Sequence, residues 1–260
     1  MVNCGRSNST DSKVSNQSQF EWDFSEQKKY VYSYTQTSIS ENKMGKDRSI
    51  DKNKMEGIGF LNVRIKENNL SDISLTDIKM KITMFNEDST PKDTNSQELP
   101  PVVAQDMKPD GSFESSNGNI LFDYLFPLPN KKLEKGDFAE IPMQMPFNAN
   151  GSMLSVKGQN TLNFVDYKEL KGRNCAVLKG EIDISKLDTP RELKGNYQCT
   201  TTGNATYYFD LDNGCFVESD INMDIHIVMD TETPENENSG MYMEIKSHDT
   251  YKIRLENIVE

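Results

Sequence analysis

The stretch Ile221-Asn-Met-Asp-Ile-His-Ile-Val-Met229 alternates apolar and polar side chains along most of its length. Successive side chains of an extended strand point to opposite faces, so this pattern places its isoleucines and methionines on one face. The same period of two recurs at Tyr30-Tyr32-Tyr34, Ile78-Met80-Ile82-Met84, Ala205-Tyr207-Phe209 and Met241-Met243-Ile245. No segment carries a sustained helical stripe. We therefore predict a mostly β protein with long antiparallel strands, in a sandwich or half-barrel, and little helix.

The 260 residues suit one all-β domain or two closely packed ones. The pattern divides into a flexible tether (1–19), a first β region (20–85), a linker or loop excursion (86–119) and a main β region (120–260). The excursion is predicted from its polar run and from Pro100-Pro101. Both β regions contain long strands with alternating Met and Ile, so two similar halves are one alternative.

The charge balance limits the partners. There are 29 Lys and Arg against 41 Asp and Glu, which gives a net charge of -12. Such a field repels phosphate backbones, so we expect no nucleic-acid partner. The chain has no run of 18 apolar residues, so we expect a membrane association only through a lipid anchor.

The N-terminus suggests such an anchor. Cys4 precedes a Ser- and Asn-rich segment that has the composition of a flexible tether. This arrangement resembles the mature start of a bacterial lipoprotein, in which the thiol carries lipid. We therefore predict lipidation at Cys4 and an extracytoplasmic location, membrane-anchored or secreted. The alternative is a cytoplasmic protein with a disordered N-terminus and a free Cys4.

The remaining cysteines are Cys175, Cys199 and Cys215. They form no Cys-x-x-Cys pair, and the chain has only two histidines, so no metal site is predicted. If the segments 173–184 and 195–209 form a hairpin, Cys175 and Cys199 lie on neighbouring strands, and we predict a disulfide between them. The alternative is that the three thiols are small buried apolar groups.

Catalytic residues are not predicted. Ser247-His248-Asp249 invites a triad interpretation, but adjacent strand residues point to opposite faces and cannot form one relay. His226 is expected to be a solvated strand histidine beside Asp224. The sequence shows no phosphate-binding loop and no cofactor motif, so we predict no enzymatic activity, no cofactor and no cofactor-binding residue.

Methionine is the one unusual residue type, with 13 in the chain. Flexible thioethers suit an adaptable apolar cavity, but we favour the alternative that they fill an ordinary core. Those at apolar positions of predicted strands are Met80, Met84, Met143, Met145, Met223, Met229, Met241 and Met243.

Residues 120–230 carry a set of local motifs. These are Phe126-Pro-Leu-Pro129, Leu133-Glu-Lys-Gly-Asp137, Gly172-Arg-Asn-Cys-Ala176, Gly203, Tyr207-Tyr-Phe-Asp210 and Asn213-Gly214. They resemble a family of uncharacterised bacterial envelope proteins and lipoproteins. Phe138 follows Gly136-Asp137 where that family has a tryptophan. The resemblance implies a fold but no chemistry, because the family has no assigned activity.

The composition and the motifs leave three functions open. The first is a non-enzymatic extracytoplasmic binding or structural module of a bacterial envelope. The second is a carrier of a hydrophobic ligand in a curved β-sheet cavity. The third is a carboxylate-dependent hydrolase, which the lack of paired catalytic motifs disfavours.

Overall fold

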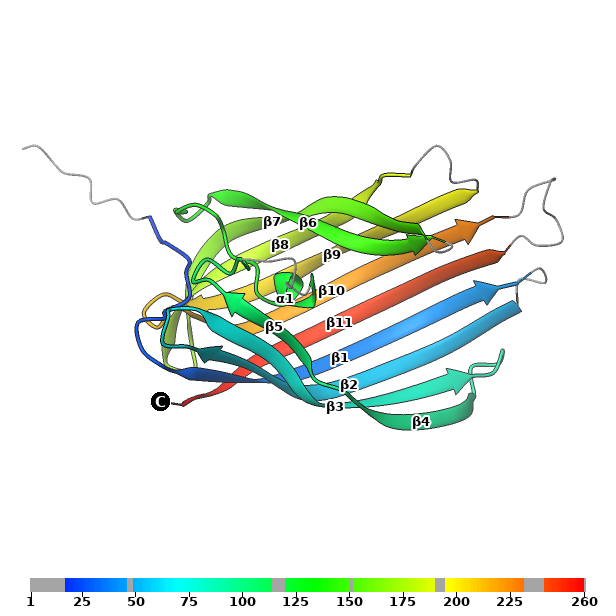
Figure 1. The fold of residues 1–260 in the computed structure, drawn as a ribbon, viewed down its shortest axis with the longest axis horizontal. Coiled ribbons are helices and arrows are strands. Elements are labelled where there is room, and N and C mark those ends of the chain that lie inside the picture. Colours follow the sequence, from blue (N-terminus) through cyan, green and yellow to red (C-terminus); the bar gives the residue numbers. More distant parts are fainter. Residues whose placement is uncertain are drawn as a thin grey trace, which may run out of the picture.

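The computed structural model describes residues 17–45, 49–113, 120–149, 152–189, 195–231 and 241–259. They form one open antiparallel sheet and one short helix (Figure 1). The elements are β1 (Lys29–Met44), β2 (Ser49–Ile65), β3 (Ser71–Phe85), β4 (Pro91–Leu99), β5 (Val102–Met107), α1 (Ile120–Leu125), β6 (Phe138–Ala149), β7 (Ser152–Leu170), β8 (Arg173–Leu187), β9 (Asn196–Asp210), β10 (Cys215–Asp230) and β11 (Tyr242–Val259). The predicted fold class is confirmed, as a half-barrel-like open sheet.

The strand order is β4-β3-β2-β1-β11-β10-β9-β8-β7-β6, with β5 also paired to β3. Two meanders, β1–β4 and β6–β11, become one sheet because the first strand pairs with the last along its whole length. The two predicted β regions therefore share a single sheet. The pairing of β1 with β11 could not be predicted from local patterns, because these two strands lie far apart in the sequence.

The described part of the predicted linker or loop excursion, residues 86–113, contains two strands, and residues 114–119 lie outside the described part of the chain. Of the two strands, β4 pairs with the Ile78–Phe85 part of β3, and β5 pairs with the Ser71–Leu75 part of the same strand. Pro100 and Pro101 therefore mark a break between two consecutive edge strands and not a boundary between domains. Proline cannot donate to a ladder, which is why the pairing stops there.

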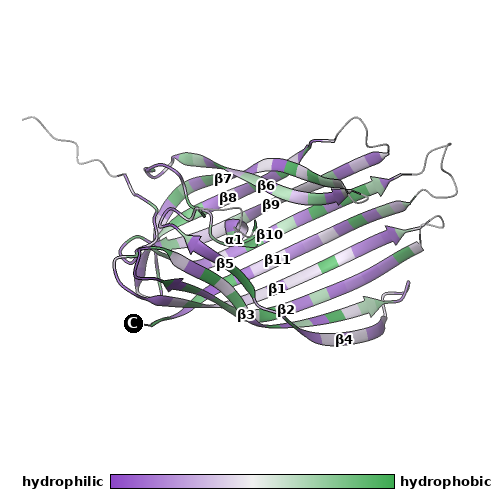
Figure 2. Ribbon diagram, viewed as in Figure 1, coloured by the Kyte–Doolittle hydropathy of each residue, from purple (hydrophilic) through white to green (hydrophobic). Residues whose placement is uncertain are grey.

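The sheet has two faces and two ends. The inner face carries the buried apolar residues that alternate along the strands other than β4. Figure 2 shows hydrophobic and hydrophilic residues alternating along the ribbon. The proximal end is defined by the short β2–β3, β7–β8 and β9–β10 turns and by the start of β1. The distal end is defined by the β1–β2, β3–β4, β8–β9 and β10–β11 connections.

Packing on the inner face is densest at the proximal end. Phe216 is fully buried, and its ring centroid lies 5.1 Å from that of Phe126, 5.1 Å from Phe209 and 5.6 Å from Trp22. Phe20, Trp22 and Phe24 are all buried, although the segment before β1 is not a strand of the sheet. It crosses the core in extended form, and the backbone N–H groups of Trp22 and Asp23 donate to the carbonyls of Pro109 and Gly214.

The apolar stretch 120–129 contains α1, the one short helix among the described residues. Its carbonyls dock on the sheet, because the Tyr207 hydroxyl donates to the Tyr124 carbonyl at 3.0 Å and the Ser219 hydroxyl donates to that of Leu125 at 2.9 Å. The Tyr124 hydroxyl lies 3.9 Å from the Met145 sulfur of β6. The sheet thus curls around α1, which touches β6, β9 and β10.

Two local features depart from regular strand and hairpin geometry. Asp212-Asn213-Gly214 joins β9 to β10, but only Gly214 in this connection has a positive φ (52°), so the connection is not the mirror-image turn that Asn-Gly usually forms. A bulge lies where the apolar phase slips at Phe60-Leu61. Its extra residue is on β3, where Asp77 has a φ of 52°.

Candidate functional site

A groove crosses the distal part of the sheet on the outer face, opposite the core. It encloses about 700 Å³, which falls within the range of roughly 300–1,000 Å³ that is usual for small-molecule sites. Its lining comes from six neighbouring strands, β9, β10, β11, β1, β2 and β3. The lining residues are Ile39, Ser40, Glu41, Lys52, Asn53, Phe85, Ser89, Thr200, Thr202, Asp224, Ile225, His226, Lys246, Ser247 and His248.

The strand register explains this set. One straight row of register partners runs from β9 to β3, and its members are Thr200, His226, Lys246, Glu41, Lys52 and Phe85. A second row, one step along the strands, contains Thr202, Asp224, His248 and Ile39. Since neighbouring strands are about 4.8 Å apart, the first row is roughly 24 Å long. The groove therefore runs across the strands.

Charged and imidazole side chains occupy the middle of both rows, and neutral or apolar side chains lie at their ends. The Ile39 side chain is 55% exposed, although it lies in the middle of a strand. Phe85 lies at the β3 end of the groove, and the two threonines lie at the β9 end. The lysine stems add methylene groups to the walls while their ammonium groups reach solvent. The surface can thus hold an apolar body and contact a polar group at the same time.

Glu244 organises the charges at the distal rim. Its Oε1 lies 3.0 Å from Nζ of Lys246 and 3.0 Å from Nε2 of His226, and its Oε2 accepts from Nζ of Lys43 at 3.1 Å. Hydrogen bonds from Lys246, His226 and Lys43, in that order of size, lower the pKa of Glu244 to about 2. The carboxylate stays ionised and fixes the positions of three cationic or polar side chains.

The second histidine has its own carboxylate. Nδ1 of His248 lies 2.8 Å from Oδ1 of Asp224 across the β10–β11 ladder, and both side chains are largely exposed. The sequence placed Asp224 beside His226, but the register pairs it with His248. His226 lies on the outer face with its side chain 38% exposed, and its carboxylate partner is Glu244. Within the described residues neither imidazole bonds a hydroxyl group, so the groove contains no assembled nucleophile and base.

The side chains of Ser247, His248 and Asp249 do not lie on one face of the sheet, as the alternation predicts. Ser247 is part of the groove lining, but the register places its side chain on the inner face with that of Asp249, to which its hydroxyl donates at 2.5 Å. The side chain of His248 lies on the outer face. On the inner face a polar chain continues from Asp249 to Tyr251 and from there to Gln36. These groups satisfy one another, and burial raises the pKa of Tyr251. Their arrangement is therefore structural.

The methionines lie on the other side of the sheet from the groove. By register, seven of the eight methionines named above face inward, and Met80, Met143, Met223 and Met229 are buried in the core. Met241 precedes β11 and is 38% exposed. The lining of the outer groove contains no methionine. The buried thioethers thus fill the core and do not form the groove.

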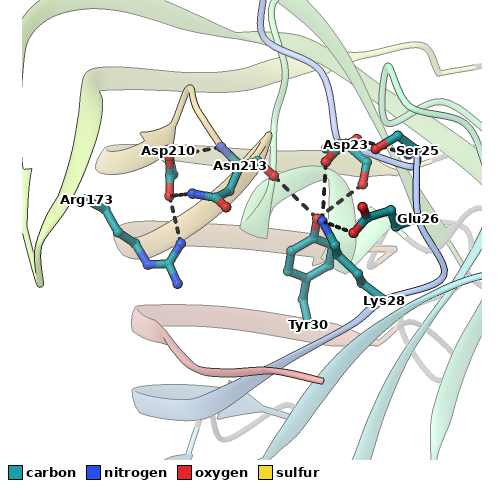
Figure 3. A network of polar contacts seen from close by, with 8 residues as sticks. All are labelled: Asp23, Ser25, Glu26, Lys28, Tyr30, Arg173, Asp210 and Asn213. Carbon is teal, nitrogen blue, oxygen red and sulfur yellow. Dashed lines mark hydrogen bonds and ion pairs between the residues drawn. The ribbon is translucent and has the colours of Figure 1, made fainter. Parts of the chain in front are cut away.

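A polar network at the proximal end stabilises the β9–β10 turn (Figure 3). Asp210 is fully buried, and its carboxylate accepts from Arg173 at 2.8 Å and from the backbone N–H groups of Asp212 and Asn213. Next to it, the Tyr30 hydroxyl donates to the carbonyl oxygen of Asp23. Both carboxylate oxygens of Asp210 are thereby engaged by the protein itself, so we interpret the network as a turn-stabilising one.

The predicted disulfide does not form. Cys175, Cys199 and Cys215 are free and buried, and burial raises the pKa of the Cys175 and Cys199 thiols to about 11. Cys175 is the register partner of Asp210, eleven residues along β9 from Cys199. The two strands do form a hairpin, but Cys175 lies far from its turn and Cys199 lies near it. Cys4 lies outside the described residues.

The described part of the chain contains no group of three or more His, Cys, Asp or Glu side chains that could hold a metal ion. Among the same residues, no helix has the length and apolarity needed to cross a bilayer.

Comparison with known proteins adds a structural likeness only. No family model and no curated protein matches the chain. A solved structure described as showing lipid–protein interactions in lipovitellin resembles it with a TM-score of 0.45 and 14% sequence identity. The match covers 90% of this chain and 26% of the lipovitellin chain, so the chain spans about a quarter of that protein's length.

Proposed function

We propose that this protein is a non-enzymatic binding module that holds an amphipathic small molecule in the outer groove. The observation that carries the proposal is the combination of a 700 Å³ volume with an exposed Ile39 and a rim of paired charges. An apolar part of the ligand would lie on Ile39, Phe85 and the threonines. A polar or anionic group of the same ligand would contact Lys52 or Lys246.

The second hypothesis from the sequence, a carrier of a hydrophobic ligand, agrees with this proposal except in the location of the ligand. The apolar surface offered to a ligand is the outer groove and not a methionine-lined cavity, because the buried methionines pack against other core residues. The hydrolase alternative receives no support, since the two imidazoles are bonded to carboxylates and not to a nucleophile.

The groove can be blocked from one strand. Thr202 lies at its β9 end and is exposed, so a Thr202→Trp variant would fill the groove without disturbing the core. Thr206→Trp provides a matched control, because Thr206 is on the same strand and the same face but outside the groove. The probe is an environment-sensitive fluorescent fatty acid, and its affinity is measured by titration.

We expect Thr202→Trp to weaken binding of the probe at least tenfold and Thr206→Trp to leave it unchanged. Saturable binding that is equal in the wild type and both variants would place the site elsewhere. The complete absence of binding, together with native mass spectra free of any co-purified molecule, would contradict the proposal.

We also propose the extracytoplasmic location predicted from Cys4 and the segment that follows it. Incorporation of radiolabelled palmitate by the wild type, and its loss in Cys4→Ser, is the expected result in cells of the source organism. An unlabelled wild-type protein recovered from the cytoplasm would contradict the location.

A further inference from the structure

The outer face near the groove differs in charge from the rest of the molecule. On the distal outer face of β11, β1, β2 and β3, the register brings together six lysines and three glutamates. The whole chain has 29 basic and 41 acidic residues, so this surface has the opposite balance. We call it the lysine patch, and its lysines are Lys43, Lys52, Lys54, Lys79, Lys81 and Lys246.

The three glutamates do not remove the excess charge. Glu56 is paired with Lys54 at 2.7 Å, Glu244 with Lys43 and Lys246, and Glu41 lies 3.9–4.0 Å from Lys43 and Lys52. Lys79 and Lys81 form no ion pair with any described residue. The hydrogen bond from Lys54 lowers the pKa of Glu56, and hydrogen bonds from Lys246, His226 and Lys43 lower that of Glu244, so these two carboxylates remain ionised.

Large apolar side chains lie among the lysines. Ile39, Ile50, Ile58 and Phe60 are 48–55% exposed, and all four point outward from β1 or β2. Isolated exposed apolar residues are common on protein surfaces, but four on two adjacent strands, surrounded by lysines, form a continuous amphipathic surface. It extends past the groove, since Ile58 and Phe60 do not line it.

We propose that the lysine patch docks the protein on a lipid bilayer that contains anionic headgroups. Lysines near such a surface each contribute about 1 kcal/mol of attraction, and the half-exposed isoleucines and Phe60 can enter the interface between headgroups and acyl chains. The partner is a bilayer and not a nucleic acid for two reasons. Three of the four apolar side chains are isoleucines, which cannot stack on bases, and the strongly acidic remainder of the molecule repels a long polyanion.

This docking is independent of the proposed ligand site, although the two surfaces adjoin. Lys54, Lys79 and Lys81 belong to the patch but do not line the groove. A variant with all three replaced by glutamate therefore tests docking alone, and Thr202→Trp tests the groove alone. The matched control for the charge change is Lys132→Glu/Lys179→Glu/Lys186→Glu, three exposed lysines outside the patch.

The experiment is cosedimentation of the full chain, expressed without lipid attachment, with vesicles of phosphatidylcholine alone or with one-third phosphatidylglycerol. We expect binding to the anionic vesicles only, decreasing as salt rises because charges at the surface are screened. Lys54→Glu/Lys79→Glu/Lys81→Glu should reduce the partition coefficient about 100-fold, while the control triple variant and Thr202→Trp should bind like the wild type. Ile58→Ser/Phe60→Ser should remove the part of binding that persists at high salt.

Equal binding to neutral and anionic vesicles, or equal loss in the patch variant and the control, would overturn the docking proposal. Equally tight binding to duplex DNA at the same phosphate concentration would overturn the assignment to lipid. Circular dichroism shows whether each variant folds. If one does not, the salt dependence of wild-type binding to the anionic vesicles still tests the docking proposal.

Discussion

The proximal and distal parts of the sheet are built from the same strands but are stabilised differently. At the proximal end the inner face is covered by α1, β5 and the segment before β1, and the aromatic rings around Phe216 are fully enclosed. At the distal end the same strands extend outward, and Ile227 and Met243 are only half-buried on the inner face. The outer face there carries the groove and the lysine patch. One part of the sheet supplies stability, and the other supplies accessible surface.

The difference between the two ends of the sheet has a physical cause. A sheet buries apolar area only where another layer covers it, and buried area is the main favourable contribution to folding. The covered end can therefore hold the long strands in register, and the uncovered end can expose side chains without destabilising the fold. Binding surfaces commonly lie on such extensions of a rigid scaffold.

The largest expected effect is on the aromatic core. Phe216→Ala should lower the free energy of unfolding by about 3–5 kcal/mol, because it leaves a cavity among rings that cannot collapse into it. Ile227→Ala on the same strand, at the distal end, should lower it by only about 1–2 kcal/mol. Urea denaturation followed by circular dichroism measures both. Equal effects would show that the two ends are equally important for stability.

The next largest effect on stability is expected at one of two aspartates that both follow an apolar residue in a strand. Asp210→Asn removes the charge that Arg173 and two backbone N–H groups bind, and should cost about 2–3 kcal/mol. Asp224→Asn, which affects only the exposed pair with His248, should change stability by less than about 0.5 kcal/mol. Thermal unfolding of both variants in one buffer provides the comparison, and a large effect of Asp224→Asn would contradict it.

The smallest effect is on the distal rim. The pKa of Glu244 in the folded state, about 2, lies below its ordinary value of 4.5. The group therefore contributes stability above pH 4.5 and loses that contribution as pH falls toward 2. Because it lies in a surface network, Glu244→Gln should destabilise the protein at neutral pH by only about 1 kcal/mol. Urea unfolding at several pH values should show the difference from wild type disappearing between pH 4.5 and 2. A difference that grows on acidification would disprove this explanation.

Much of the fold was predictable because the alternation of side chains is a local signal. The inward positions of Tyr30, Tyr32 and Tyr34 and the long strands follow from the alternation of neighbouring residues. The failure of the Ser247-His248-Asp249 triad was predictable for the same reason. The predicted Cys175–Cys199 disulfide was wrong because neighbouring strands alone do not bring two cysteines together. Both cysteines would have to lie equally far from the hairpin turn, and that position depends on the register of the strands.

The groove and the lysine patch could not be predicted in this way. Lysines and isoleucines on β1, β2, β3 and β11 come from sequence positions up to about two hundred residues apart, and the pairing of β1 with β11 brings them together. The only available sequence signal was the outward phase of Ile39, Ile58 and Phe60 in strands whose inner positions were already apolar.

The strands, the apolar side of each strand and the acidic character of the chain can all be read from the amino-acid order, since they depend on residues near one another or on simple totals. Three features could be recognised only in the tertiary structure. They are the pairing of the first strand with the last, the continuation of the sheet by β4 and β5, and the position of two histidines and six lysines on one face. Register between distant strands is set by how the whole sheet packs around α1 and the aromatic core, and no local stretch of the chain encodes it.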